Sequence, residues 1–247
     1  MDVTRSGVSK IVLVTGAYRG IGKILVDYLA PAWNVWPVYR TAWQAAQLHN
    51  LTQETSCISH WFHGDLRNTG TIRTIKRACT RQEGSIHALI HCPGPIIYSP
   101  QVISRWSTWE SMFRDNMQSS VNLIRELGGS IHSGRIILFG FSGLDTRAGY
   151  KTIAAYAAAK EALASLARSA AKMLASQQTT LNVIAPGVFL DDNGEVPSHG
   201  ARMLPAIPLG RYGGPGDITG VVEWLISEQS QYVTGQVIKG SGGLHIS

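Results

Sequence analysis

Short apolar runs recur along the chain, and the segments between them carry apolar residues at helical spacing. This alternation is typical of strand–helix–strand units, in which helices cover both faces of a parallel sheet. The predicted strands are residues 11–14, 35–39, 57–62, 88–91, 135–139, 181–185 and 237–239. We therefore expect a single α/β domain over residues 1–247, with one doubly wound seven-stranded sheet and a full core.

Charge and composition narrow the functional classes. The chain has a net charge of +6, but its basic residues are scattered singly, so nucleic acid is not an expected partner. No apolar stretch reaches the roughly 18 residues of a membrane span, and the N-terminal residues lack a secretory signal. The three cysteines, Cys57, Cys79 and Cys92, have no metal-like spacing, which favours a reducing, cytoplasmic location.

Two predicted helices carry polar residues on an apolar stripe, where a polar side chain needs a partner. The stripe of the helix after Ser104 consists of Trp109, Phe113, Asn116, Ser120, Ile124 and Leu127. The stripe of the helix after Thr152 consists of Tyr156, Lys160, Leu163, Ala167 and Leu174. Asn116, Tyr156 and Lys160 are therefore candidates for a functional site.

A glycine-rich turn follows the first predicted strand. It reads Thr15-Gly16-Ala17-Tyr18-Arg19-Gly20-Ile21-Gly22 and leads into a helical segment. Glycines allow a sharp turn and a close approach to a pyrophosphate, and the helix offers its positive N-terminal end. The position directly after the first strand favours a dinucleotide site over an ordinary turn.

A phenol and an ammonium lie one helical turn apart at Tyr156 and Lys160. At this spacing the cation is expected to lower the phenol's pKa from about 10 and to hold a cofactor ribose. Ser142 follows the fifth predicted strand, at the edge where open α/β sheets bind ligands. The three side chains are candidates for one catalytic site.

With the T-G-x-x-x-G-x-G turn, Ser142 and the Tyr156/Lys160 pair, the sequence resembles the short-chain dehydrogenase/reductase family over nearly its whole length. The resemblance implies a Rossmann fold with strand order 3-2-1-4-5-6-7, a nicotinamide dinucleotide, and a homotetramer or homodimer. It also implies that Tyr156 is the general acid, Ser142 orients the substrate carbonyl, Lys160 binds the ribose and Asn116 anchors a water.

The same resemblance implies further cofactor contacts. Asp65 and Leu66 would lie at the adenine, although Asp65 could instead cap a helix. The implied contacts are Gly16, Tyr18, Arg19, Gly20, Ile21, Gly22, Arg40, Asp65, Leu66, Gly94, Tyr156, Lys160, Pro186, Gly187 and Val188. The second strand ends in Arg40 without a carboxylate, and Arg19 lies in the glycine turn. Either arginine could be a surface charge, but together they predict NADP(H), because basic residues pair with its 2′-phosphate.

Two features depart from the family pattern. The segment His91-Cys92-Pro93-Gly94 replaces the usual Asn-Asn-Ala-Gly, and we interpret His91 as a structural substitute rather than an acid or base. Few basic residues precede the fifth and sixth strands, where reductases that dock an acidic acyl carrier protein often have them. Docking of such a carrier therefore stays open.

The expected reaction is NADPH-dependent reduction of a ketone. The C-terminal part looks most like 3-oxoacyl-[acyl-carrier-protein] reductases, so a 3-oxoacyl thioester is the leading substrate. Another small carbonyl, a pterin, a sugar or a polyol is the alternative, and a non-catalytic dinucleotide sensor is the alternative of another class. Enoyl reductases of the family would need a tyrosine at Ile153. We expect residues 95–102 and a mobile loop at 189–209 to select the substrate.

Overall fold

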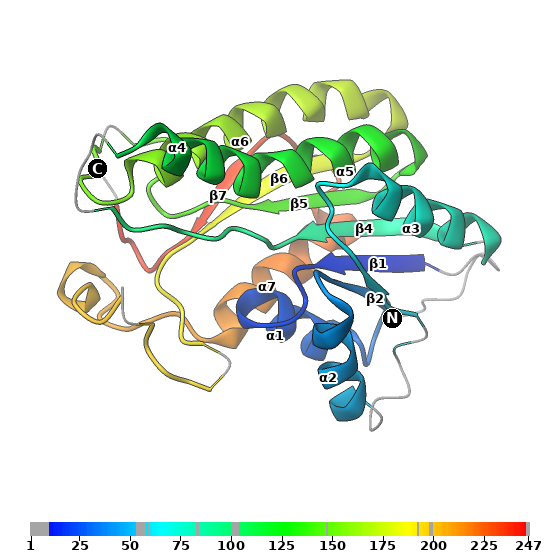
Figure 1. Cartoon of the computed structure of the whole chain (residues 1–247), viewed down its shortest axis with the longest axis horizontal. Helices are drawn as coiled ribbons and strands as arrows, with labels where there is room; N and C mark the ends of the chain where they lie inside the picture. Colours follow the sequence, from blue (N-terminus) through cyan, green and yellow to red (C-terminus); the bar gives the residue numbers. More distant parts are fainter. Residues whose placement is uncertain are drawn as a thin grey trace.

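The computed structural model describes residues 10–52, 58, 60–82, 84–99, 104–146, 148–191, 193–197 and 200–245. Strands and helices alternate along the chain (Figure 1). The strands are β1 (Lys10–Thr15), β2 (Asn34–Tyr39), β3 (Phe62–His63), β4 (Ser85–His91), β5 (Arg135–Phe139), β6 (Thr180–Pro186) and β7 (Val237–Gly240). The helices are α1 (Gly20–Leu29), α2 (Ala42–Thr52), α3 (Thr69–Arg81), α4 (Trp106–Phe113), α5 (Ser119–Leu127), α6 (Ala154–Leu174) and α7 (Pro215–Ile226).

The strands form one parallel sheet in the order β3-β2-β1-β4-β5-β6-β7, which confirms the predicted fold class and strand order. The chain builds outward from β1 to β3 and then returns to place β4 on the other side of β1. The connections after β1 and β4 therefore leave the sheet in opposite directions. This is the switch point at which open α/β sheets bind ligands.

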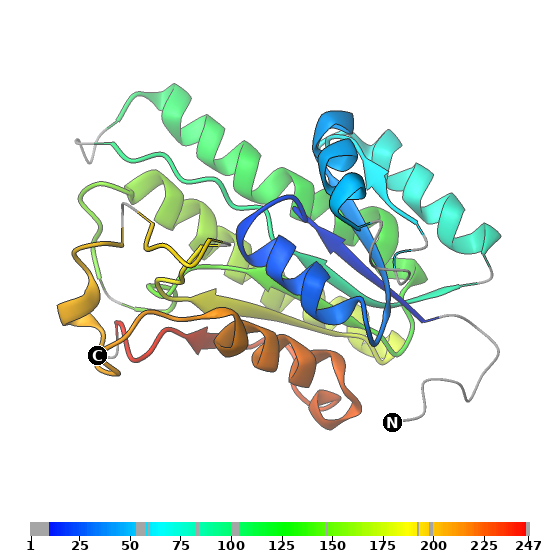
Figure 2. The ribbon, with the colours of Figure 1, turned by 90° about the horizontal axis from the view of Figure 1, so that it is seen from below.

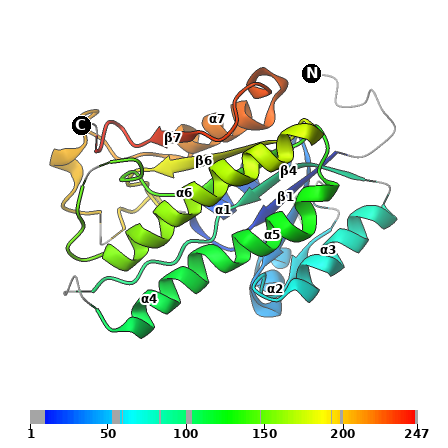
Figure 3. The same cartoon turned by 90° about the horizontal axis from the view of Figure 1, so that it is seen from above.

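Helices cover both faces of the sheet. Figure 2 shows α1 and α7 side by side on one face, and Figure 3 shows α3, α5 and α6 on the other. Alternate side chains of β1 explain this arrangement: Val12 and Val14 pack towards α1 and α7, whereas Ile11 and Leu13 pack towards the opposite helices. Within the described ranges, no helix is long and apolar enough to cross a membrane.

Two elements differ from the sequence-based expectation. The third strand covers only Phe62–His63, next to β2, instead of 57–62; Cys57 lies outside the described residues. The helix expected after Ser104 contains a π-helical turn, η1 (Arg114–Gln118), between α4 and α5. A π turn shifts the faces of the helices on either side of it. Phe113 is therefore exposed, while Asn116 and Ser120 are buried.

Candidate active site

The glycine turn between β1 and α1 has the backbone conformation that its sequence predicts. Gly16 and Gly20 have φ angles of +73° and +57°, in the left-handed region that favours glycine. A Cβ on Gly22 would overlap the carbonyl oxygen of Gly16, so only glycine lets the first turn of α1 pack against the loop. The N-terminus of α1 is thereby held at the carboxyl end of β1, where it can bind a phosphate.

Beside this turn lies a cavity of about 470 Å³ at the carboxyl ends of β1, β2, β3 and β4. The predicted contacts Gly16, Tyr18, Arg19, Arg40, Asp65, Leu66 and Gly94 all line it. The sequence analysis did not anticipate Gln44, Arg67, Asp115 and Ser119, which also line it. Gln44 accepts a hydrogen bond from the backbone N–H of Arg40 at 3.0 Å and so fixes the end of β2.

Charged side chains are concentrated at the outer end of this cavity. Arg67 donates to both carboxylate oxygens of Asp65, and its Nη1 lies 2.7 Å from Asp115 Oδ1. Arg40 is exposed, with its Nη2 3.9 Å from Asp65 Oδ2. The hydrogen bonds from Arg67 lower the pKa of Asp65. Asp65 is not the cap of α3, because Asn68 occupies that position and accepts from the Gly70 N–H.

The catalytic candidates lie further along the same sheet edge. Ser142 follows β5 and is buried, and Tyr156 lies in the first turn of α6. The Phe141 ring, next to Ser142, lies 5.6 Å from the ring of Tyr156 in an edge-to-face arrangement. Neither hydroxyl makes a hydrogen bond to any residue that the structure describes. Both are therefore available to a bound carbonyl oxygen.

Lys160 lies one turn after Tyr156 and is fully buried. Its Nζ donates to the Phe139 carbonyl at 2.7 Å and lies 5.7 Å from the centroid of the Tyr156 ring. A Cβ on Gly94 would be 2.7 Å from this Nζ, so glycine is needed for the close approach of the ammonium to the segment after β4. Burial lowers the pKa of Lys160 to about 7.

The expected lowering of the Tyr156 pKa is not observed. Burial raises the pKa of this phenol, and the nearby phenol of Tyr98 raises it further. The prediction was wrong because burial of the phenol dominates its pKa, while the Lys160 ammonium is directed at the Phe139 carbonyl. Tyr156 is consequently protonated at neutral pH, the form that a proton donor requires.

Asn116 is held at the centre of η1. Its Nδ2 donates to the carbonyls of Pro95 and Met112, both at 3.0 Å. Its Oδ1 is buried without a hydrogen-bond partner among the described residues, and lies 3.4 Å from the Cβ position of Gly94. Buried acceptors are normally satisfied by protein or water. The residues that line the cavity thus fit a dinucleotide. The unsatisfied Asn116 Oδ1 fits a bound water molecule.

Comparison with known proteins identifies the family. A family model described as enoyl-(acyl carrier protein) reductase matches residues 16–245. The chain belongs to the short-chain dehydrogenase/reductase family. The chain is therefore an NAD(P)-dependent oxidoreductase acting on CH–OH and C=O groups.

Relatives of the short-chain reductase have several names. It is 28% identical to a Staphylococcus aureus 3-oxoacyl-[acyl-carrier-protein] reductase, FabG, over 96% of this chain and 99% of that protein. It is 29% identical to a 2-dehydro-3-deoxy-D-gluconate 5-dehydrogenase of Pseudoalteromonas atlantica, over 95% of each. It is also similar to a crystal structure of a blue fluorescent protein from a metagenomic library in complex with NADPH. That similarity has a TM-score of 0.84 and 27% identity, over 97% of this chain and 99% of the other.

His91 replaces an asparagine of the family pattern in this short-chain reductase. Its Nδ1 lies 2.6 Å from Thr15 Oγ1 and its Nε2 lies 3.0 Å from Ser119 Oγ, so the ring joins β1, β4 and α5. Burial lowers the pKa of His91 to about 3, and the positive charge of Lys160 contributes to the decrease. His91 is therefore uncharged at neutral pH, and its two hydrogen bonds link β1, β4 and α5.

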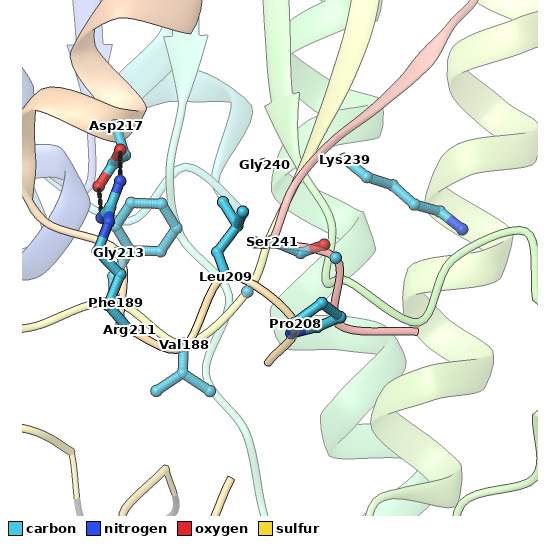
Figure 4. A pocket seen from close by; sticks show the side chains of 13 residues that line it. Val188, Phe189, Pro208, Leu209, Arg211, Gly213, Asp217, Lys239, Gly240 and Ser241 are labelled. Atoms are coloured by element: carbon cyan, nitrogen blue, oxygen red, sulfur yellow. Dashed lines mark hydrogen bonds and ion pairs between the residues drawn. The ribbon is translucent and has the colours of Figure 1, made fainter. Parts of the chain in front are cut away.

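A second cavity, of about 400 Å³, lies between the segment after β6 and the end of β7. The predicted cofactor contacts Gly187 and Val188 line this second cavity and not the one beside the glycine turn; Pro186 precedes them at the end of β6. A Cβ on Gly187 would lie 2.8 Å from Ser241 Cα, so glycine permits this close packing. Figure 4 shows Arg211 paired with Asp217, while Lys239 extends away from them.

Proposed function

We propose that this short-chain reductase uses NADPH to reduce a ketone carbonyl, with a 3-oxoacyl thioester as the leading substrate class. One observation carries the proposal: the hydroxyls of Ser142 and Tyr156 have no hydrogen-bond partner in the described part of the chain. They lie on the same sheet edge as buried Lys160 and the glycine-lined cavity.

The chain's own residues support the choice of cofactor. The glycine turn and the start of α1 would hold the pyrophosphate, and Gly94 and Lys160 would hold the ribose next to the nicotinamide. Arg19 and Arg40 are exposed and line the same cavity, where their guanidinium groups can bind a 2′-phosphate. A carboxylate at position 40, in place of Arg40, would favour NAD(H), which lacks the 2′-phosphate.

The proposed reaction uses each polar group in one role. Bound NADPH supplies the hydride that reduces the carbonyl carbon. Tyr156 donates its proton to the carbonyl oxygen as negative charge develops there, and Ser142 donates a hydrogen bond to the same atom. The resulting phenolate lies next to the Lys160 ammonium, which stabilises it. Asn116 Oδ1 would hold a water through which the proton is replaced.

The names of the relatives support more than one substrate class for this chain. The FabG relative acts on 3-oxoacyl groups by its name, and the gluconate dehydrogenase by its name acts on a sugar acid. Oxidation of a sugar or polyol is therefore the second candidate. A non-catalytic sensor receives little support, because Ser142, Tyr156 and Lys160 are all present. We also propose that residues 189–209, described except for 192, 198 and 199, move during substrate binding, and that the chain forms a homotetramer or homodimer.

The function is tested by following the absorbance of NADPH during incubation with acetoacetyl thioesters, simple diketones, pterins and sugar acids. Consumption of NADPH with the thioesters is expected. Tight NADPH binding without turnover of any carbonyl compound would favour the sensor and contradict the proposal.

A further inference from the structure

Apolar and aromatic side chains surround the proposed proton donor. Tyr156 packs in a buried cluster with Met112, Ala155 and Ala159. Ile96, Trp109, Phe141 and Ile153 pack against this cluster and are only partly buried. These four residues come from the segment after β4, from α4, from the end of β5 and from the approach to α6. Apolar side chains from four parts of the chain thus pack around the cluster that holds the catalytic phenol.

Phe141 directly precedes Ser142 in the sequence, and its ring contacts the ring of Tyr156. Its ring makes edge-to-face contacts with Tyr150 at 5.3 Å and with Tyr156 at 5.6 Å, and its neighbour is Ser142. A Cβ on Gly143 would lie 2.5 Å from the Phe141 ring and would overlap the Tyr150 hydroxyl. The glycine therefore allows both rings to lie over the turn that carries Ser142.

The segment after β4 adds Tyr98 on the same side of the catalytic phenol. The Ser99 N–H donates to the Thr152 carbonyl at 2.8 Å, and Asn116 binds the Pro95 carbonyl, so both ends of the segment are anchored. Tyr98 is 48% exposed, yet its phenol influences the ionisation of Tyr156. Because Ser99 is bound to Thr152, four residues before Tyr156, we expect a group bound next to the Tyr156 hydroxyl to contact Tyr98 as well as Phe141.

The surroundings of Tyr156 are mainly apolar. Its side chain packs in a buried cluster of hydrophobic residues, and burial and the Tyr98 phenol both raise its pKa. Lys160 lies behind the ring and is bound to the Phe139 carbonyl. An anionic substrate would find the Lys160 ammonium already bound to a backbone carbonyl, and burying its charge against apolar side chains would be unfavourable.

We infer that Phe141, Tyr98 and Tyr150 determine specificity, and that they favour an uncharged ketone with an aromatic ring next to its carbonyl, such as a 3-aryl-3-oxopropanoyl thioester. The inference rests on the proposed ketone reduction and narrows its substrate class. Aromatic rings prefer edge-to-face and offset contacts with one another, and such contacts add to the effect of burial. The three rings offer several such contacts to a planar group held at the Tyr156 hydroxyl.

The test compares acetoacetyl and 3-oxo-3-phenylpropanoyl thioesters of N-acetylcysteamine at saturating NADPH. The wild-type protein should have the higher kcat/KM for the phenyl ketone. Phe141→Leu, which keeps an apolar side chain without a ring, should lower the phenyl-to-methyl ratio of kcat/KM about two- to tenfold, as should Tyr98→Leu. Tyr232→Ala removes a fully exposed aromatic ring outside the site and should leave the ratio unchanged.

The outcomes separate this inference from the proposed function. Turnover of both thioesters with no phenyl preference, or with a ratio that Phe141→Leu and Tyr98→Leu leave unaltered, would overturn the inference and leave ketone reduction intact. Failure to reduce either thioester or any other ketone, while NADPH still binds, would contradict the proposed function itself.

Discussion

At the scale of single residues, we expect Arg40 to decide which dinucleotide this chain prefers. Arg40→Asp should reverse the preference, because a carboxylate repels the 2′-phosphate that the guanidinium binds. Loss of a hydrogen bond to a charged group corresponds to about a 10- to 100-fold increase in the KM for NADPH. Steady-state KM values for NADPH and NADH measure the effect.

Arg77→Asp is the matched control for this change of charge. Arg77 is exposed on α3 and does not line the cavity of Arg40, so its substitution should leave the selectivity as it is. An Arg40→Asp protein that still prefers NADPH would show that Arg40 is a surface charge without a role in cofactor choice.

His91 makes stability depend on pH. Its pKa is about 3 in the folded chain and 6.5 in the reference state, so the unfolded chain binds an additional proton between these values. The stability due to the neutral imidazole is complete above pH 6.5. It decreases as the pH falls towards 3, by up to about 1.4 kcal/mol per pH unit.

Urea unfolding at several pH values measures this dependence. His91→Asn removes the titrating ring and retains a polar group, so the free energy of unfolding should fall less steeply below pH 6.5 than in the wild type. Equal slopes for the two proteins would mean that His91 is not the group responsible.

At the scale of elements, we expect the packing of α1 against the glycine turn to affect both stability and cofactor binding. Gly22→Ala forces a Cβ onto the Gly16 carbonyl, so the helix must shift away from the glycine turn. We expect weaker NADPH binding and a lower melting temperature. Gly220→Ala is the control within a helix: a Cβ there meets nothing within 4 Å, and alanine should stabilise α7 by up to about 1 kcal/mol.

Fluorescence titration with NADPH and thermal unfolding distinguish the two alanine variants. If Gly22→Ala bound NADPH as tightly as the wild type, the close packing of α1 on the glycine turn would not matter for the cofactor.

Sequence spacing anticipated most elements but not how they join. The apolar runs predicted the sheet, and the stripe from Tyr156 to Leu174 is buried as expected. The π turn η1 was not predicted, because one extra residue in a helical turn does not disrupt a spacing of three or four residues between apolar positions. The links from Arg67 to Asp115 and from His91 to Thr15 join residues 48 and 76 positions apart, which no local pattern shows.

At the scale of the whole molecule, one parallel sheet brings the ends of β1, β2, β4 and β5 together and so places the glycine turn, Arg40 and Ser142 along one edge. The net charge of +6 is explained in part by this geometry. Arg19 and Arg40 line the cavity proposed to bind an anionic cofactor. Lys160 contacts the Phe139 carbonyl and the ring of the catalytic phenol.

The most direct test of the whole account is the Tyr156→Phe variant of the full chain, assayed with NADPH and acetoacetyl thioester and titrated with NADPH alone. Removal of the proton donor should lower kcat by about 100-fold or more. The affinity for NADPH should change little, because the ring and Lys160 are retained. A variant that kept its kcat would contradict the assignment of Tyr156 as the acid.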